Sequence, residues 1–61
     1  MIVYEKSPGN DIKVYLIYSN SKTRAGTIKK VDGGYSYFTF GTPVRQGDIY
    51  NTIDEVKASL D

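Results

Sequence analysis

The chain of 61 residues contains neither cysteine nor histidine. Without cysteine, disulfides cannot stabilise the fold, and thiolate-based zinc or redox chemistry is excluded. Without histidine, the usual general base near neutral pH and the commonest metal ligand are both missing. The absence of histidine also rules out serine–histidine triads, because a triad needs a positioned imidazole to activate its nucleophile.

Long apolar runs are also missing. The longest covers residues 14–18, which is the length of a strand, whereas a helix that spans a bilayer needs about 20 apolar residues. The first residues lack the basic-then-apolar pattern of a signal peptide. We therefore expect a cytoplasmic protein with no membrane partner. Residues 1–61 should form a single small domain with a stability of a few kcal/mol.

The acidic residues and the glycines match no catalytic or cofactor-binding motif. Asp11, Asp32 and Asp48 lie in turn-like segments, where aspartate is favoured. Asp54 and Glu55 are adjacent at a predicted helix start, where capping and the helix dipole explain them. No phosphate-binding loop and no calcium-loop spacing is present. We expect a protein that is not an enzyme and that uses neither a cofactor nor a metal.

Most of the chain reads as strands separated by turns. Residues 2–6 and 12–18 are rich in β-branched and aromatic side chains, and a turn signal over residues 7–11 separates them. A third strand runs from about residue 23 to residue 31. Asp32-Gly33 then predicts a two-residue turn of type I′ that leads into the aromatic segment 33–41. The segment that follows, to residue 47, predicts a loop, with a short extended piece at 48–50.

The last part of the chain predicts a helix that opens with a capping box. Thr52 and Glu55 have the spacing for it, and Ile53, Val56 and Leu60 form a narrow apolar stripe. Two turns of helix are not stable alone in water, so this helix must lie on the sheet. The sequence therefore predicts an α+β fold: an antiparallel three- to four-stranded β-meander with one C-terminal α-helix packed on one face.

The predicted turn also assigns side chains to the two faces of the sheet. It pairs Thr27 with Phe38 and Lys30 with Tyr35. We predict that the helix covers the face with Phe38 and Phe40, because that face is the more apolar one. The opposite face should be open and should bind a partner. Its expected contact residues are Lys13, Tyr15, Arg24, Lys30, Tyr35 and Tyr37.

Three stretches, at residues 26–30, 34–37 and 47–60, are similar to small phage and prophage proteins. The resemblance covers residues 24–60 and implies a short β-meander followed by a C-terminal helix that opens with threonine. It also implies a role in binding and redirecting or inhibiting host machinery, including defence and nucleic-acid enzymes. It transfers no catalytic or binding residue, because the matching positions are turn glycines, strand aromatics and helix caps.

Two functions follow from these observations. The first is a non-enzymatic protein-interaction module that inhibits or regulates a larger host protein, because tyrosine and arginine are enriched at interface hot spots. The alternative is a nucleic-acid-binding module, because residues 13–45 carry six basic side chains and one acidic one, while the whole chain has a net charge of +1. A homodimer formed through a strand edge or the aromatic face is a third interpretation.

Overall fold

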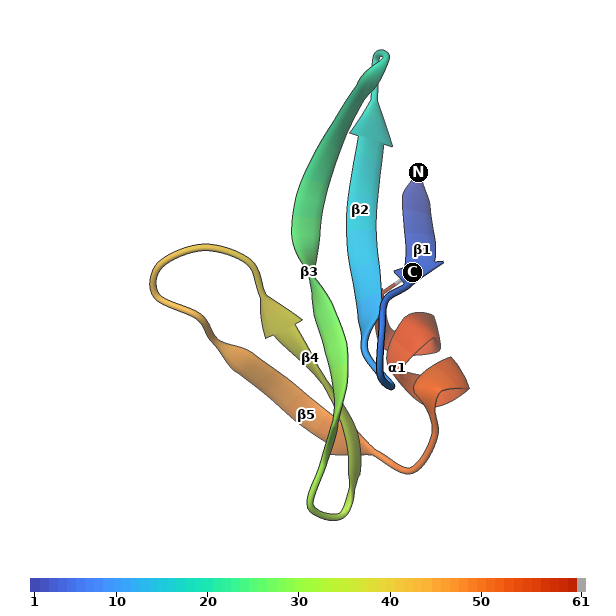
Figure 1. The fold of residues 1–61 in the computed structure, drawn as a ribbon, viewed down its shortest axis with the longest axis vertical. Helices are drawn as coiled ribbons and strands as arrows, with labels where there is room; N and C mark the ends of the chain where they lie inside the picture. The colour runs from blue at the N-terminus through green and yellow to red at the C-terminus, as the bar shows by residue number, and fades with distance from the viewer. Residues whose placement is uncertain (61) are drawn as a thin grey trace.

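The computed structural model describes residues 1–60, so residue 61 of the predicted domain lies outside the described part. One five-stranded antiparallel sheet and one helix make up the fold (Figure 1). The elements are β1 (Ile2–Lys6), β2 (Ile12–Tyr18), β3 (Ser21–Val31), β4 (Gly34–Thr39), β5 (Gln46–Tyr50) and α1 (Ile53–Leu60). Within the described residues, no helix has the length and apolar character needed to cross a membrane.

The α+β class, the antiparallel meander and the C-terminal helix are confirmed. The sheet order is the chain order, β1-β2-β3-β4-β5. The sheet has five strands rather than three to four, because β5 forms where we predicted the end of a loop and a short extended piece. β5 pairs with β4 through Tyr35 and Tyr50 and through Ser36 and Ile49. The buried Ser36 hydroxyl donates to the carbonyls of Gly47 and Asp48 and so fastens β5 to the sheet.

Two short turns set the strand registers. Between β3 and β4, Val31 pairs with Gly34, which confirms the predicted two-residue turn. Of its two central residues only Gly33 has a positive φ, 92°, so the turn is not of type I′ as predicted. Between β2 and β3, Ser19 and Asn20 both have positive φ, 47° and 68°. Because of this short turn, β3 begins at Ser21, two residues before the start that we predicted.

A β-bulge interrupts the pairing of β2 with β3. Val14 lies opposite Gly26, whereas the next residue, Tyr15, lies opposite Arg24, so Ala25 is the extra residue. Side chains along a strand alternate between the two faces of the sheet, and a bulge inserts one extra residue. Beyond the bulge, odd- and even-numbered residues therefore exchange faces. Arg24 and Thr27 therefore share one face, although their numbers differ by three.

The core lies between the sheet and α1. Its most buried side chains are Ile12, Val14, Ile28 and Val56, which come from β2, β3 and α1. The partly buried residues around them are Ile2, Tyr4, Ala25, Tyr35, Tyr37, Tyr50, Ile53 and Leu60. The predicted apolar stripe of the helix is confirmed, since Val56 is buried in the core and Ile53 and Leu60 pack against it.

The predicted start of α1 is confirmed as well. The Thr52 hydroxyl accepts a hydrogen bond from the Glu55 amide at 3.2 Å, which satisfies one of the free N–H groups at the helix N-terminus. The same hydroxyl donates to the Glu55 carboxylate at 3.3 Å. Figure 1 shows α1 beside the lower ends of β1 and β2, well away from the tip of the β2–β3 hairpin.

The prediction of which face of the sheet α1 covers is wrong. The β3–β4 pairing is as predicted, but α1 covers the face with Tyr35 and Tyr37, and Phe38 projects from the other face. The bulge is the physical reason, because it places Ile28 on the same face as the aliphatic residues of β2. These side chains form a continuous apolar surface for the helix. Gly26 leaves room there for the Tyr37 ring, since a Cβ at residue 26 would lie 2.6 Å from the tyrosine Cζ.

Candidate functional site

The side of the sheet opposite α1 is called the open face here. It is defined by eight residues of β2, β3, β4 and the residue after β4. They are Lys13, Tyr15, Lys22, Arg24, Thr27, Lys29, Phe38 and Phe40. Cationic and aromatic side chains alternate over this surface, and no helix of the described residues covers it.

Arg24 lies at the centre of the open face. Its guanidinium carbon is 5.7 Å from the centre of the Tyr15 ring and 5.1 Å from that of the Phe40 ring. The side chain donates from Nη2 to the Thr27 hydroxyl at 2.6 Å and from Nε to the Gly26 carbonyl at 3.1 Å. These bonds use two of the five N–H groups of a guanidinium, so an oriented donor set is left for a ligand.

Two lysines extend this pattern on either side of Arg24. The Lys22 ammonium lies 4.4 Å from the centre of the Tyr15 ring and forms an ion pair with Glu5. The hydrogen bond to Glu5 raises the pKa of Lys22 above its ordinary value. The Lys29 ammonium lies 5.5 Å from the centre of the Phe38 ring. Each aromatic ring of the open face therefore has a cation beside it.

A groove with a volume of about 410 Å³ runs along one edge of the open face. Its walls are Phe38 and Phe40 on the sheet side and Thr42 and Val44 on the loop side. Arg24 and Lys29 line the same groove. Phe40 and Val44 are 63% and 62% exposed, so the groove presents accessible apolar surface.

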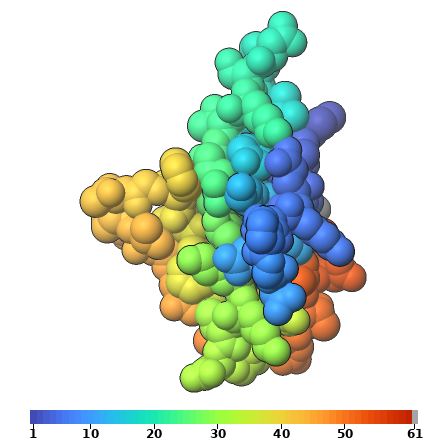
Figure 2. Space-filling view, in the orientation of Figure 1, coloured from blue at the N-terminus to red at the C-terminus, as the bar shows by residue number. Residues whose placement is uncertain are grey.

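The loop that forms the outer wall is held at its base. The Thr39 amide donates to the Arg45 carbonyl at 2.9 Å, and the Arg45 amide donates to the Thr39 hydroxyl at 2.8 Å. These bonds close the loop between β4 and β5. In Figure 2 the loop, coloured yellow to orange, projects from the body of the molecule beside β3.

The open face contains half of the predicted contact residues. Lys13, Tyr15 and Arg24 lie on it as predicted. Placing Tyr35 and Tyr37 there was wrong, because both pack against the core on the α1 side. Lys30 is exposed, but it pairs with Tyr35 and so projects from the α1 side of the sheet.

Five residues of the open face were missed from the predicted set. They are Lys22, Thr27, Lys29, Phe38 and Phe40. One available signal was Ser19-Asn20, because a two-residue turn there pairs Lys22 with Ile17 and puts the lysine on the same face as Tyr15. The phenylalanines were missed because they were assigned to the face under the helix.

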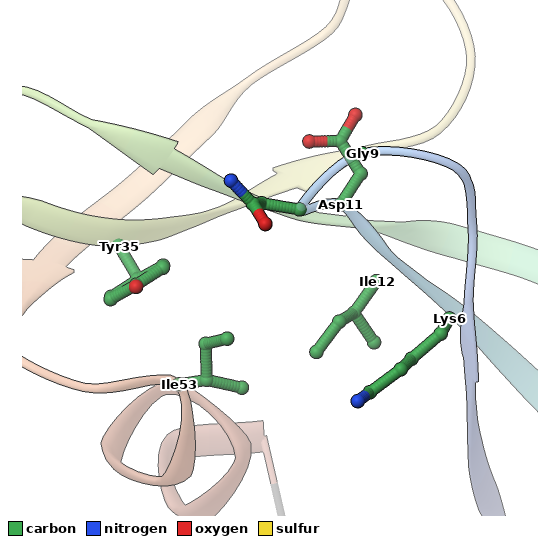
Figure 3. Close-up of a pocket in the computed structure, with 7 residues that line it drawn as sticks. Lys6, Gly9, Asp11, Ile12, Tyr35 and Ile53 are labelled. Atoms are coloured by element: carbon green, nitrogen blue, oxygen red, sulfur yellow. The ribbon is translucent and has the colours of Figure 1, made fainter.

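A second, smaller cavity lies where the β1–β2 turn meets the start of α1 (Figure 3). Its volume is about 170 Å³, below the range of about 300–1,000 Å³ that is typical of ligand pockets. Ile12, Tyr35 and Ile53 line it, and Figure 3 shows the Asp11 carboxylate pointing away from Tyr35 and Ile53. No cluster of three or more histidine, cysteine, aspartate or glutamate side chains occurs in residues 1–60. We interpret this cavity as a packing gap.

No protein-family model, curated protein or solved structure matches the chain. Function is therefore inferred from the geometry and charge of the open face. The face carries Lys13, Lys22, Arg24 and Lys29, with Glu5 as the neighbouring acid. The helix, in contrast, is acidic in its first turn.

Proposed function

We propose that the protein binds nucleic acid through its open face. The observation that carries this proposal is the pairing of every aromatic ring on the face with a cation. Tyr15, Phe40 and Phe38 each have a lysine or arginine group within 5.5 Å of the ring centre. Aromatic rings on a sheet stack with nucleobases, and neighbouring cations neutralise phosphates.

The distribution of charge supports the same function. The net charge of the whole chain is only +1, so attraction of a polyanion must be local. Four of the eight basic residues lie on the open face, namely Lys13, Lys22, Arg24 and Lys29, whereas Asp54 and Glu55 lie in the first turn of α1. The ion pair of Lys22 with Glu5 is exposed, and exposed pairs contribute little stability. A phosphate can therefore replace Glu5 as the partner of Lys22 at small cost.

Two adjacent lysines provide a matched test. Lys29 lies on the open face beside Phe38, and Lys30 projects from the opposite side of the sheet; both are exposed. Fluorescence anisotropy with labelled single-stranded and duplex oligonucleotides should show an affinity that falls steeply as salt rises. Lys29→Gln should reduce the slope of log affinity against log salt by about 0.7–0.9, and Lys30→Gln should leave it unchanged.

Two results would contradict nucleic-acid binding by this face. One is the absence of binding to either kind of oligonucleotide at low salt. The other is an equal loss of affinity in the two lysine variants, since net charge rather than the open face would then explain the binding.

The second candidate is a larger protein partner with an acidic surface. The exposure of Phe40 beside Arg24 favours it, because aromatic and arginine side chains are enriched at protein interfaces. A complex that survives nuclease digestion, forms again from the purified partner and is lost in Phe40→Ala but kept in Tyr18→Ala would support it. Tyr18 is the matched control, because its ring is 82% exposed and lies on the other side of the sheet. It is an even-numbered residue of β2, like Val14, and so belongs to the α1 side.

A further inference from the structure

The groove lined by Phe38, Phe40 and Val44 combines aromatic, aliphatic and cationic side chains, which is the chemistry of a base-binding site. Resting on the proposed function, we propose that it takes an unpaired nucleobase, so that the protein selects single-stranded over double-stranded nucleic acid. The base would lie against the phenylalanine rings of one wall. The loop that carries Val44 would close over its other side.

The walls of the groove fit a flat, largely apolar ring. Phe38 and Phe40 provide aromatic surface, and Val44 adds aliphatic surface from the loop between β4 and β5. Phe40 is 63% exposed although Arg24 lies over its ring, so much of its surface is open to a ligand. Every base has a π-face, so stacking in this slot would tolerate any sequence.

The cations of the groove fit the phosphates on either side of the base. Arg24 and Lys29 both line the groove, next to Phe40 and Phe38 respectively. The arginine is held by Thr27 and the Gly26 carbonyl, and it still has N–H groups for a phosphate oxygen. One slot thus combines a stacking surface with charge for the adjoining backbone.

Duplex nucleic acid cannot use this arrangement. In a duplex both faces of each base are covered by its neighbours, so a protein ring reaches a base face only after the base is flipped out. The major groove of B-DNA is about 12 Å wide. The two shorter dimensions of the molecule are 24 and 23 Å, so the face as a whole is too broad to enter it. A duplex would contact the lysines and the arginine through its phosphates alone.

The test compares two exposed aromatic residues on opposite sides of the sheet. Phe40→Leu removes the stacking ring from the groove, and Tyr18→Leu removes an 82% exposed ring outside it. Anisotropy titrations should show single-stranded oligonucleotides binding more tightly than the duplex of the same sequence. Phe40→Leu should weaken single-strand binding about tenfold and leave duplex binding unchanged. Tyr18→Leu should change neither, and circular dichroism should confirm that both variants are folded.

An abasic strand separates stacking from charge, because it keeps the phosphates and lacks the bases. The loss caused by Phe40→Leu should disappear when wild type and variant are compared on an abasic oligonucleotide. If the loss persists, Phe40 acts by positioning Arg24 and the base slot is refuted. Equal affinity for single strand and duplex would also refute it, while leaving nucleic-acid binding intact. Failure of every oligonucleotide to bind would refute both proposals.

Discussion

Tyr37 shows how one side chain joins the sheet to the core. Its hydroxyl donates to the Ala25 carbonyl at 2.8 Å, so the ring bridges the bulge in β3. The ring packs against the core residues under α1. Burial raises the pKa of Tyr37 above its ordinary value of about 10, because the phenolate loses hydration inside the fold.

This pKa shift predicts that stability falls at alkaline pH. The folded-state pKa lies above the unfolded-state value, so the folded protein binds more protons between the two. The stabilisation is fully present below about pH 10 and is lost as the pH rises through the folded-state pKa. Urea unfolding from pH 8 upward should show a steeper decline for the wild type than for Tyr37→Phe.

The comparison isolates Tyr37 from other groups that titrate in the same range. The raised pKa of Lys22 contributes to the alkaline decline as well, but equally in both proteins. At neutral pH the variant should lose about 1 kcal/mol through the missing hydrogen bond. Parallel pH profiles for the two proteins would contradict the assignment of the decline to Tyr37.

At the scale of single elements, the sequence predicts the local features well. The capping box places the start of α1, because the cap involves residues only three apart. Asp32-Gly33 gives the β3–β4 register, because the turn and the first pairs beside it are neighbours in the chain. These features need no knowledge of the rest of the fold.

The covered face of the sheet could not be predicted in the same way. It depends on the bulge at Ala25, which decides whether Ile28 joins the aliphatic residues of β2 or faces away from them. The residue that marks the bulge in the sequence is Gly26. A glycine inside a strand is typical either of a bulge or of a site where another part of the chain approaches closely, and the sequence does not distinguish the two. With the bulge unrecognised, Arg24 was grouped with Tyr35 and Tyr37, whereas it packs beside Phe40. Three of the eight residues of the open face were therefore predicted.

Gly26→Ala should disrupt the bulge and the β3–β4 ladder. The added Cβ would lie 2.5 Å from the Tyr37 hydroxyl oxygen and would also clash with the Phe38 carbonyl. We expect a loss of about 1–3 kcal/mol in the free energy of unfolding, measured by urea denaturation.

Gly47→Ala is the matched control for this substitution. A Cβ there would lie 3.5 Å from the Tyr37 carbonyl oxygen, which is ordinary contact. Its stability should change by less than about 1 kcal/mol. If Gly26→Ala is equally mild, the close packing of the Tyr37 ring over Gly26 is not a constraint on the fold.

At the scale of the whole molecule, the fold depends on a very small core. Among the described residues, four apolar side chains are buried, and Val56 is the one that α1 contributes. Domains of this length have little stability to spare, because they bury a smaller share of their surface than larger ones. Each buried side chain therefore accounts for a large part of the total free energy of unfolding.

Val56→Ala should lower the free energy of unfolding by about 1–3 kcal/mol, because it removes two methyl groups from the centre of the core. Val44→Ala makes the same chemical change at a side chain that is 62% exposed, and it should alter stability by less than about 0.5 kcal/mol. Chemical denaturation followed by circular dichroism measures both. Similar losses in the two variants would show that burial under α1 does not govern stability.

The sheet order also bears on how the chain acquires its structure. Each strand pairs with the next one along the chain, across connections of two to six residues, so every hairpin closes at low entropic cost. The hydrogen bond from the Tyr4 hydroxyl to the Lys57 carbonyl, in contrast, joins residues 53 apart. Docking of α1 on the sheet therefore closes the longest loop. When α1 undocks, every pair of neighbouring strands can stay hydrogen-bonded. In hydrogen exchange, we expect the amides of α1 to open before those of β2 and β3.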